Sequence, residues 1–254
     1  MGDVAVGSYY RERLSGERLR RCYELASPRI RRYLDAETGH VIGLLSGAGS
    51  VLELGCGYGR IAFRFADAVP FVVGIDNAPD SLGLGARMAG RPGVVRFAAM
   101  DALRLGFTDC SFDAVACLQN GVCAFRADPG CLLGEALRVT RPGGKVVFST
   151  YAPGIWPARL EWFEAQAAAG LLGPVDRELS RDGVIVCRDG FRSGSFTRER
   201  FLELAGEYGL ESCIEEVDGS CLICTFERPR FPERRASHPP ASTEDADPRV
   251  TPRF

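Results

Sequence analysis

The chain has 254 residues, of which 46% are hydrophobic and 25% charged, a composition typical of globular proteins. Its 31 basic and 33 acidic residues give a net charge of −2, so no general positive field attracts nucleic acid, and we expect no nucleic-acid partner. No apolar stretch approaches the roughly 18 residues that cross a bilayer, and no signal-like apolar region stands near the N-terminus. We therefore expect a cytoplasmic protein without membrane attachment.

Ten cysteines are scattered through the predicted strands and helices of a chain too long to need disulfides, so we expect reduced core thiols. Cys221 and Cys224 are three residues apart in a β-like run, which places their side chains on opposite faces. Cys117 and Cys123 have no histidine nearby. We expect no metal site, and no histidine-based nucleophilic catalysis unless His40 supplies it.

The predicted elements begin with helices over residues 8–49, where apolar and aromatic side chains recur at helical spacing among arginines. From residue 51, short apolar strands alternate with helices. That alternation predicts βαβ units and a parallel sheet covered on both faces. The predicted strands are 50–55, 71–76, 94–102, 112–119 and 143–151.

The alternation loosens after Tyr151. The prolines of the segment 229–254, with almost no apolar periodicity, predict a disordered tail, because such a segment cannot offset the entropy of ordering. Between Tyr151 and this tail we predict a helix over 158–172, a hairpin over 183–196 that turns at Asp189-Gly190, and a helix after the N-cap Thr197. A two-strand unit over 211–228, which turns at Asp218-Gly219, follows.

The segment 51–66, VLELGCGYGRIAFRFA, places a glycine-rich turn between a strand and a helix. Such a turn lets a phosphate or a ribose approach the backbone and the helix N-terminus. The dinucleotide fingerprint Gly-x-Gly-x-x-Gly/Ala requires a small residue where this chain has Arg60, which weighs against a hydride carrier. We expect Arg60 to begin a solvated helical turn; the alternative is that it neutralises an anionic acceptor.

Two acidic residues follow the next two predicted strands. Asp76 ends the strand 71–76, where a carboxylate can accept both hydroxyls of a ribose; NAD would use it in the same way. Its neighbour Asn77 either approaches the adenine or caps a turn. Asp101 has no standing role in a dehydrogenase, and the alternative for it is a turn acid or a helix N-cap.

The run Glu53-Leu54-Gly55-Cys56-Gly57-Tyr58-Gly59 resembles the first motif of the class I S-adenosylmethionine-dependent methyltransferases. Asp76, Asp101 and the segments 111–122 and 138–151 follow in the family's order. The resemblance implies a Rossmann-like α/β fold whose seven-stranded, mostly parallel sheet has helices on both faces and an antiparallel last strand. It also implies an N-terminal helical lid over 1–50 and a core over 51–228 with an insertion at 152–195.

The resemblance further implies S-adenosylmethionine as the cofactor and S-adenosylhomocysteine as its product. In the family an acid at the position of Asp101 takes the adenine amino group, and the next N–H, from Ala102, reads a ring nitrogen. Because glycines follow Glu53, we expect it to orient the amino end of the cofactor by a hydrogen bond; the alternative is a strand-end charge that faces solvent. The expected cofactor-binding residues are Glu53, Gly55, Cys56, Gly57, Gly59, Asp76, Asn77, Asp101, Ala102, Leu118 and Gln119.

The sequence 118–121, Leu-Gln-Asn-Gly, stands where members that methylate amide or adenine nitrogens often carry Asn/Asp-Pro-Pro-aromatic, which argues against those acceptors. Gln119 and Asn120 either hydrogen-bond the cofactor or acceptor, or form a polar turn in which Gly121 supplies the special φ. The candidate acceptor-binding residues are Tyr10, Asn120, Tyr151 and Trp156.

The predicted function is methyl transfer to an O, N, S or C atom of a small-molecule acceptor, mainly by proximity and in-line orientation. No residue stands out as a general base. The alternatives are a methyltransferase acting on a macromolecule, an NAD-type oxidoreductase, and a non-catalytic S-adenosylmethionine-binding module. We expect a monomer or a homodimer.

Overall fold

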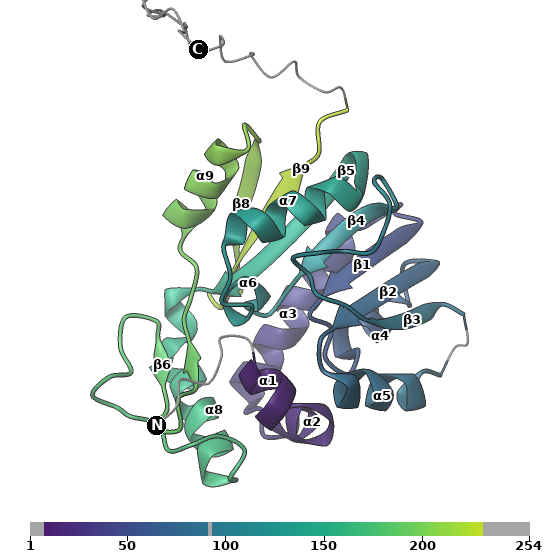
Figure 1. Cartoon of the computed structure of the whole chain (residues 1–254). Helices are drawn as coiled ribbons and strands as arrows, with labels where there is room; N and C mark the ends of the chain where they lie inside the picture. Colours follow the sequence, from purple (N-terminus) through teal and green to yellow (C-terminus); the bar gives the residue numbers. More distant parts are fainter. Residues whose placement is uncertain (1–7, 91–92, 231–254) are drawn as a thin grey trace, which may run out of the picture.

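A twisted seven-stranded sheet forms the centre of the molecule (Figure 1). The computed structural model describes residues 8–90 and 93–230. The strand order is β3-β2-β1-β4-β5-β9-β8, and β9 alone runs antiparallel to its neighbours β5 and β8, as expected. The strands are β1 Ser50–Leu54, β2 Phe71–Asp76, β3 Val95–Ala99, β4 Phe112–Cys117, β5 Thr140–Tyr151, β8 Ser212–Val217 and β9 Cys221–Glu227.

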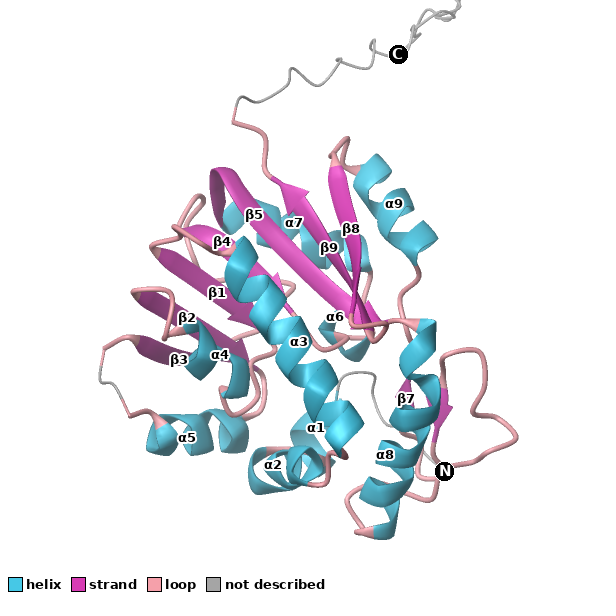
Figure 2. Ribbon diagram, turned by 180° about the vertical axis from the view of Figure 1, so that it is seen from behind, coloured by secondary structure: helices cyan, strands magenta, loops and turns pink. Residues whose placement is uncertain are grey.

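Helices cover both faces of the sheet, α3 and α4 on one and α7 and α9 on the other (Figure 2). A separate hairpin pairs β6 (Ile185–Val186) with β7 (Arg192–Ser193) around the predicted turn. The helices are α1 Ser8–Arg13, α2 Gly16–Glu24, α3 Pro28–Leu44, α4 Arg60–Phe65, α5 Pro79–Met88, α6 Gly121–Ala124, α7 Pro129–Val139, α8 Trp156–Ala168 and α9 Arg198–Glu207, with a 3₁₀ turn at Pro153–Ile155.

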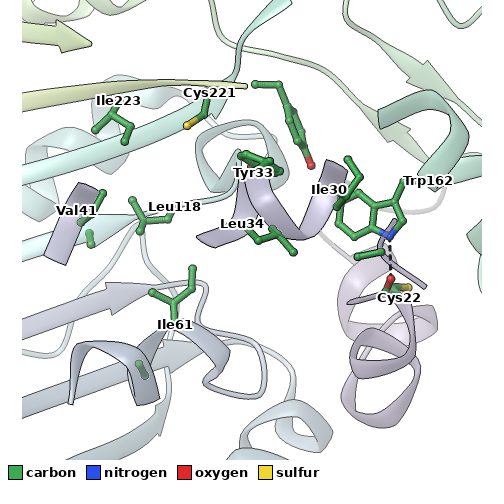
Figure 3. Close-up of a cluster of buried hydrophobic side chains, with 14 of the residues drawn as sticks. Cys22, Ile30, Tyr33, Leu34, Val41, Ile61, Leu118, Trp162, Cys221 and Ile223 are labelled. Atoms are coloured by element: carbon green, nitrogen blue, oxygen red, sulfur yellow. Dashed lines mark hydrogen bonds between the residues drawn. The ribbon is translucent and has the colours of Figure 1, made fainter. Parts of the chain in front are cut away.

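The strands are apolar on both faces because each face is covered. Cys221 belongs to the core cluster beneath α3, together with Tyr33 and Val41 (Figure 3). Cys224, three residues later, belongs to the cluster on the opposite face with Phe201 of α9. This confirms the predicted alternation along β9, and the ten cysteines are free thiols.

Strand β5 begins earlier than predicted, at Thr140 rather than residue 143. Its pairing with β4 skips from Thr140 to Lys145, so the glycine-containing turn is a bulge within the strand. Gly143 has φ +77°, and a Cβ on Gly144 would lie 2.4 Å from the carbonyl oxygen of Asp113. The close backbone approach explains the two glycines.

Parts of the predicted organisation lie outside the described residues, namely 1–7 of the lid and 231–254 of the tail. Within the described ranges, none of the helices combines the length and the apolar character that a bilayer crossing requires. Thr197 caps α9 as predicted, because its hydroxyl accepts a hydrogen bond from the backbone N–H of Arg200.

The N-terminal helices are joined to the segment that follows β5. Trp162 Nε1 on α8 donates to the carbonyl oxygen of Cys22 on α2 at 2.8 Å (Figure 3). The Tyr9 hydroxyl of α1 donates to the Asp189 carboxylate at 2.5 Å. These buried and half-buried bonds fix α1 and α2 against the insertion at the carboxyl end of the sheet.

Replacing Trp162 tests this junction. Trp162→Phe leaves the buried carbonyl of Cys22 without its donor, so we expect the free energy of unfolding to fall by about 1–3 kcal/mol. Urea denaturation followed by circular dichroism measures it. The matched control is Trp156→Phe, because Trp156 is half-buried and makes no side-chain hydrogen bond within the described ranges. An equal loss in both variants would show that ring size, not the hydrogen bond, matters.

Candidate functional site

A cavity of about 300 Å³ lies at the carboxyl ends of β1, β2, β3 and β4, beside α1 and α2. We call it the strand-end cavity. Ten of the eleven residues predicted to bind the cofactor line it, Gly59 being the exception, and Tyr10 lines it as well. The predicted residues are Tyr10, Glu53, Gly55, Cys56, Gly57, Asp76, Asn77, Asp101, Ala102, Leu118 and Gln119.

The glycine turn after β1 requires glycine at each alternate position. Gly55, Gly57 and Gly59 have φ of +72°, +55° and +83°, in the left-handed region that other residues rarely adopt. A Cβ on Gly59 would lie 2.4 Å from the Phe97 ring of β3, so this glycine serves the packing of α4 on the sheet. Gly55 and Gly57 present their backbone to the cavity.

Asp76 connects the ends of the first two strands. Its carboxylate accepts hydrogen bonds from the backbone N–H of Gly57 at 2.8 Å and of Ala78 at 2.9 Å. Burial raises the pKa of Asp76, and these two N–H groups oppose the rise. Each carboxylate oxygen retains a further lone pair, so the group can still accept from a ligand.

Asp101 lies in the turn after β3. It is exposed, and its carboxylate accepts from the backbone N–H of Leu103 at 2.9 Å, which is the turn-acid arrangement that the sequence left open. The neighbouring Ala102 is buried in the cavity wall. The predicted roles of Asp101 and Ala102 in binding the adenine therefore remain proposals.

Glu53, at the end of β1, is a buried carboxylate without a charged partner in contact. Its Oε2 atom has no hydrogen-bond partner in the described part of the chain. The pKa of Glu53 is raised to about 8, chiefly by burial; the guanidinium of Arg60 opposes the rise, and the charge of Asp76 contributes to it. The protein therefore holds a carboxyl group in the cavity that titrates near neutral pH.

Arg60 lines the same cavity, and the expectation of a solvated helical turn is wrong. Its guanidinium lies over the Tyr23 ring, 4.7 Å from the centroid, because α2 covers the start of α4. Its Nε and Nη2 atoms are buried without a hydrogen-bond partner. The only signal in the sequence is the position of an arginine directly after the glycine turn.

The corner after β4 also differs from the expected turn. Gln119 and Asn120 adopt φ of +53° and +63°, whereas Gly121 is not left-handed and begins α6. Glycine is needed at 121 for space, since a Cβ there would lie 2.6 Å from Cys117 Sγ. The Gln119 side chain accepts from the Tyr23 hydroxyl at 2.8 Å, and its Nε2 atom is buried without a partner.

Glu37, which the sequence did not single out, holds this corner from α3. It is fully buried, and its Oε1 atom accepts from Ser149 Oγ at 2.6 Å and from the backbone N–H of Gln119 at 3.2 Å. Burial raises the pKa of Glu37. A glutamate in the middle of an amphipathic helix gives no sequence signal for such a contact.

The four predicted acceptor-binding residues do not lie together. Asn120 lines none of the cavities described, because its amide group donates to the Gly194 carbonyl and accepts from Thr150 Oγ1. Trp156 lines a separate pocket at the end of β5. Tyr10 and Tyr151 line a small space of about 50 Å³, the aromatic chamber, which shares Tyr10, Tyr23 and Gln119 with the strand-end cavity. The aromatic residues of the chamber are Tyr10, Tyr23, Tyr33, Tyr151, Trp162, Phe163 and Phe191.

Among the described residues, neither a metal-binding group nor a histidine lies at these cavities. Within residues 8–90 and 93–230, no group of three or more histidine, cysteine, aspartate or glutamate side chains could hold a metal ion. His40 pairs with Glu215, at 3.1 Å, and lines none of these cavities. His40 therefore has no access to a ligand in them.

Comparison with known proteins places this site in a family. Residues 51–144 match a family model described as a methyltransferase domain. An uncharacterized methyltransferase from Mycobacterium tuberculosis is 36% identical over 137 residues, covering 50% of this chain and 52% of that protein. A demethylmenaquinone methyltransferase from Thermus thermophilus is 41% identical over 106 residues, covering 41% and 47%. The chain thus matches about half the length of these relatives.

The similarity in fold to solved structures extends over more of the chain than the similarity in sequence. The crystal structure of magnesium protoporphyrin IX methyltransferase from Synechocystis PCC 6803 matches with a TM-score of 0.58 at 16% identity, covering 88% of this chain and 97% of that one. The glycine turn and the strands β1 to β4 lie in the part that the family model matches. Over residues 51–144 the chain is therefore similar to methyltransferase domains, in agreement with the resemblance of its motifs to the class I S-adenosylmethionine-dependent family.

Proposed function

We propose that the protein binds S-adenosylmethionine in the strand-end cavity and transfers its methyl group to a small molecule. One observation carries the proposal. Glu53, Arg60 and Gln119 come from three separate segments and line one cavity, and each presents a buried polar atom that has no partner among the described residues. Buried polar groups are almost always hydrogen-bonded, so these atoms indicate a ligand that satisfies them.

The charges of these groups fit an α-amino acid. An ammonium group pairs with the carboxylate of Glu53, and a carboxylate pairs with the Nε and Nη2 donors, which share one edge of the Arg60 guanidinium. S-adenosylmethionine carries such a zwitterionic end beside its nucleoside, and NAD does not. Asp76 is then available to the ribose, and Asp101 and Ala102 to the adenine.

When bound, the cofactor supplies a sulfonium methyl group. A lone pair on the acceptor atom forms the new bond to carbon as the carbon–sulfur bond breaks, its electron pair goes to sulfur, and the acceptor releases any proton that it carried. The chain contributes enclosure and alignment, which supply much of the acceleration for an activated donor. Glu37 and Ser149 hold the Gln119 corner from behind.

The enclosure favours a small-molecule acceptor over a macromolecule. The aromatic chamber next to the strand-end cavity is walled by α1, α2, α3 and α8 and is locked by the bond between Trp162 and Cys22. The names of the Thermus and Synechocystis proteins, which refer to a quinone and a porphyrin, support the same acceptor class. The acceptor of this chain is a separate question, taken up below.

Calorimetry with S-adenosylhomocysteine and with NAD tests the cofactor. We expect the thioether product to bind and NAD to give no heat at concentrations that saturate with S-adenosylhomocysteine. Incubation with methyl-labelled S-adenosylmethionine and a metabolite extract should then give a labelled small molecule in the mass spectrum. Binding of NAD alone would indicate an oxidoreductase, and cofactor binding without any labelled product would indicate a sensor module.

Replacing Arg60 tests the zwitterion site. Arg60→Met should weaken S-adenosylhomocysteine binding about 10- to 100-fold, because a charge-assisted bidentate contact is lost. Binding of 5′-methylthioadenosine, which has no amino acid group, should be unchanged. Arg64→Met is the matched control, since Arg64 lies on the same helix, is half-exposed and pairs with Asp35 at 3.2 Å. An equal loss for both ligands would place Arg60 in the fold rather than at the ligand.

The pH dependence of binding tests Glu53. Its pKa of about 8 means that the carboxyl is mostly protonated in the free protein below pH 8, whereas the ligand ammonium requires the carboxylate. Affinity for S-adenosylhomocysteine should therefore rise with pH, by at most about tenfold per unit, until about pH 8. Calorimetry between pH 6 and pH 8 measures this. Glu53→Gln should flatten the rise, and a rise that persists in this variant would contradict the assignment.

A further inference from the structure

A second pocket, of about 650 Å³, lies at the end of β5 beside α8 and the start of α9. We call it the Arg159 pocket, after the charged residue in its wall. Arg159 is only 1% exposed, although arginine is seldom fully buried without a charged partner. The apolar part of the wall includes Trp156, Phe196 and Leu222.

Neutral groups make all of the contacts to the Arg159 guanidinium. Its Nη1 atom donates to the Gly183 carbonyl at 2.8 Å, and its Nη2 atom donates to the carbonyls of Ser193 and Gly194 at 2.8 and 3.0 Å. The Tyr151 ring lies 3.9 Å from the guanidinium carbon. No carboxylate of the described ranges forms an ion pair with Arg159, and its Nε donor is buried without a partner.

Burial of a charge without a counter-charge is unfavourable, and burial lowers the pKa of Arg159 accordingly. Its contacts to carbonyls explain how the insertion is held, but they leave the charge uncompensated and the Nε donor unused. A ligand carboxylate in the pocket would supply the missing negative charge next to the guanidinium. The pocket thus has the chemistry of a binding site for an organic acid.

The rim of the pocket limits the charge of that acid. Asp182, Glu199 and Glu216 line it, with Arg198 as the one further cation. All four are exposed, so solvent screens them, whereas Arg159 is buried. Three acidic side chains at the mouth repel a polyanion such as a nucleoside phosphate more strongly than they repel a single carboxylate. A monocarboxylate with an apolar body therefore fits best.

The position of the pocket relates it to the methyl donor. Tyr151 forms a wall of both the Arg159 pocket and the aromatic chamber, and the chamber adjoins the strand-end cavity. Gly194, which accepts from Arg159, also accepts from the Asn120 amide at the corner after β4. The Arg159 pocket and the aromatic chamber thus adjoin at Tyr151.

We propose that the Arg159 pocket binds the carboxylate of the methyl acceptor, a small monocarboxylic acid with an apolar body. The inference rests on the proposed function, because only a methyltransferase has a methyl acceptor. Since Arg159 holds the carboxylate, the methyl group goes to another atom of the acceptor. The product accordingly remains an acid rather than an ester.

Binding tests the pocket without any cofactor. A panel of apolar monocarboxylates, with 3-phenylpropionate as its first member, is titrated against the full chain beside the matched amides, here 3-phenylpropanamide. We expect at least one acid to bind about tenfold or more tightly than its amide, and Arg159→Met to abolish that preference. Arg188→Met, a change at an exposed arginine of the same insertion, should preserve it.

A second variant keeps the test open if Arg159→Met does not fold. Ser195→Trp fills the pocket and leaves Arg159 in place, so it should abolish acid binding with the affinity for S-adenosylhomocysteine unchanged. The proposal is wrong if no acid of the panel binds better than its amide, or if the preference survives in both Arg159→Met and Ser195→Trp.

A methyl-transfer assay distinguishes a failure of the Arg159 assignment from a failure of the proposed function. After incubation with labelled S-adenosylmethionine and a metabolite extract, anion exchange divides the products into acids and neutral molecules. We expect the label in the acid fraction for the wild type and in neither fraction for Ser195→Trp. A label confined to the neutral fraction overturns the Arg159 assignment alone. No label in either fraction, together with acid binding that depends on Arg159, overturns the methyltransferase proposal instead.

Discussion

The hydrogen bond between the backbone N–H of Gly57 and the Asp76 carboxylate is the contact on which the site depends. It joins the turn after β1 to the end of β2 and holds the left-handed glycines in a conformation that brings backbone, not side chains, to the cavity. Because the turn ends at Gly59, Arg60 must begin α4 there, and its side chain lies beside Glu53 in the same cavity wall. The position of both charged groups thus follows from a backbone contact.

Burial makes the charged groups of Glu53 and Arg60 selective for a ligand. Tyr23 of α2 covers the guanidinium of Arg60, and the same residue donates to Gln119 at the corner after β4. The N-terminal helices therefore remove the site from water, where unpaired polar atoms would simply be hydrated. An acid and a guanidinium so enclosed select a ligand with the opposite pair of charges, which on the proposed function is the amino acid end of the cofactor.

The sequence predicts the sheet and the residues at the strand ends because those features are local. Each strand is an apolar run, each parallel strand ends at the same edge, and a residue such as Asp76 is placed by its position in its own strand. The burial of Arg60 was not predictable in this way, since it depends on a tyrosine 37 positions earlier that belongs to another helix. Glu37 was missed for the same reason.

Contacts between segments far apart in the sequence also explain why the predicted acceptor-binding residues do not lie together. Asn120 and Tyr151 each follow a strand that ends at the site, yet the segment 193–196 draws Asn120 away to Gly194, and α8 places Arg159 against the far side of Tyr151. Within the described ranges, the lid and the insertion meet only through tertiary bonds such as that of Trp162 to Cys22. No period or spacing in the sequence encodes those bonds.

The arrangement of charge has a consequence for the proposed reaction. Arg60 lines the strand-end cavity and Arg159 lines the Arg159 pocket, and each of these shares wall residues with the aromatic chamber, whose own lining is uncharged. On these proposals each would anchor a carboxylate, so that binding energy orients both molecules. Aromatic faces in the chamber favour a cationic centre over an anionic one. A chamber of this kind suits a sulfonium methyl group and a neutral attacking atom, and it gives a charged nucleophile no counter-ion.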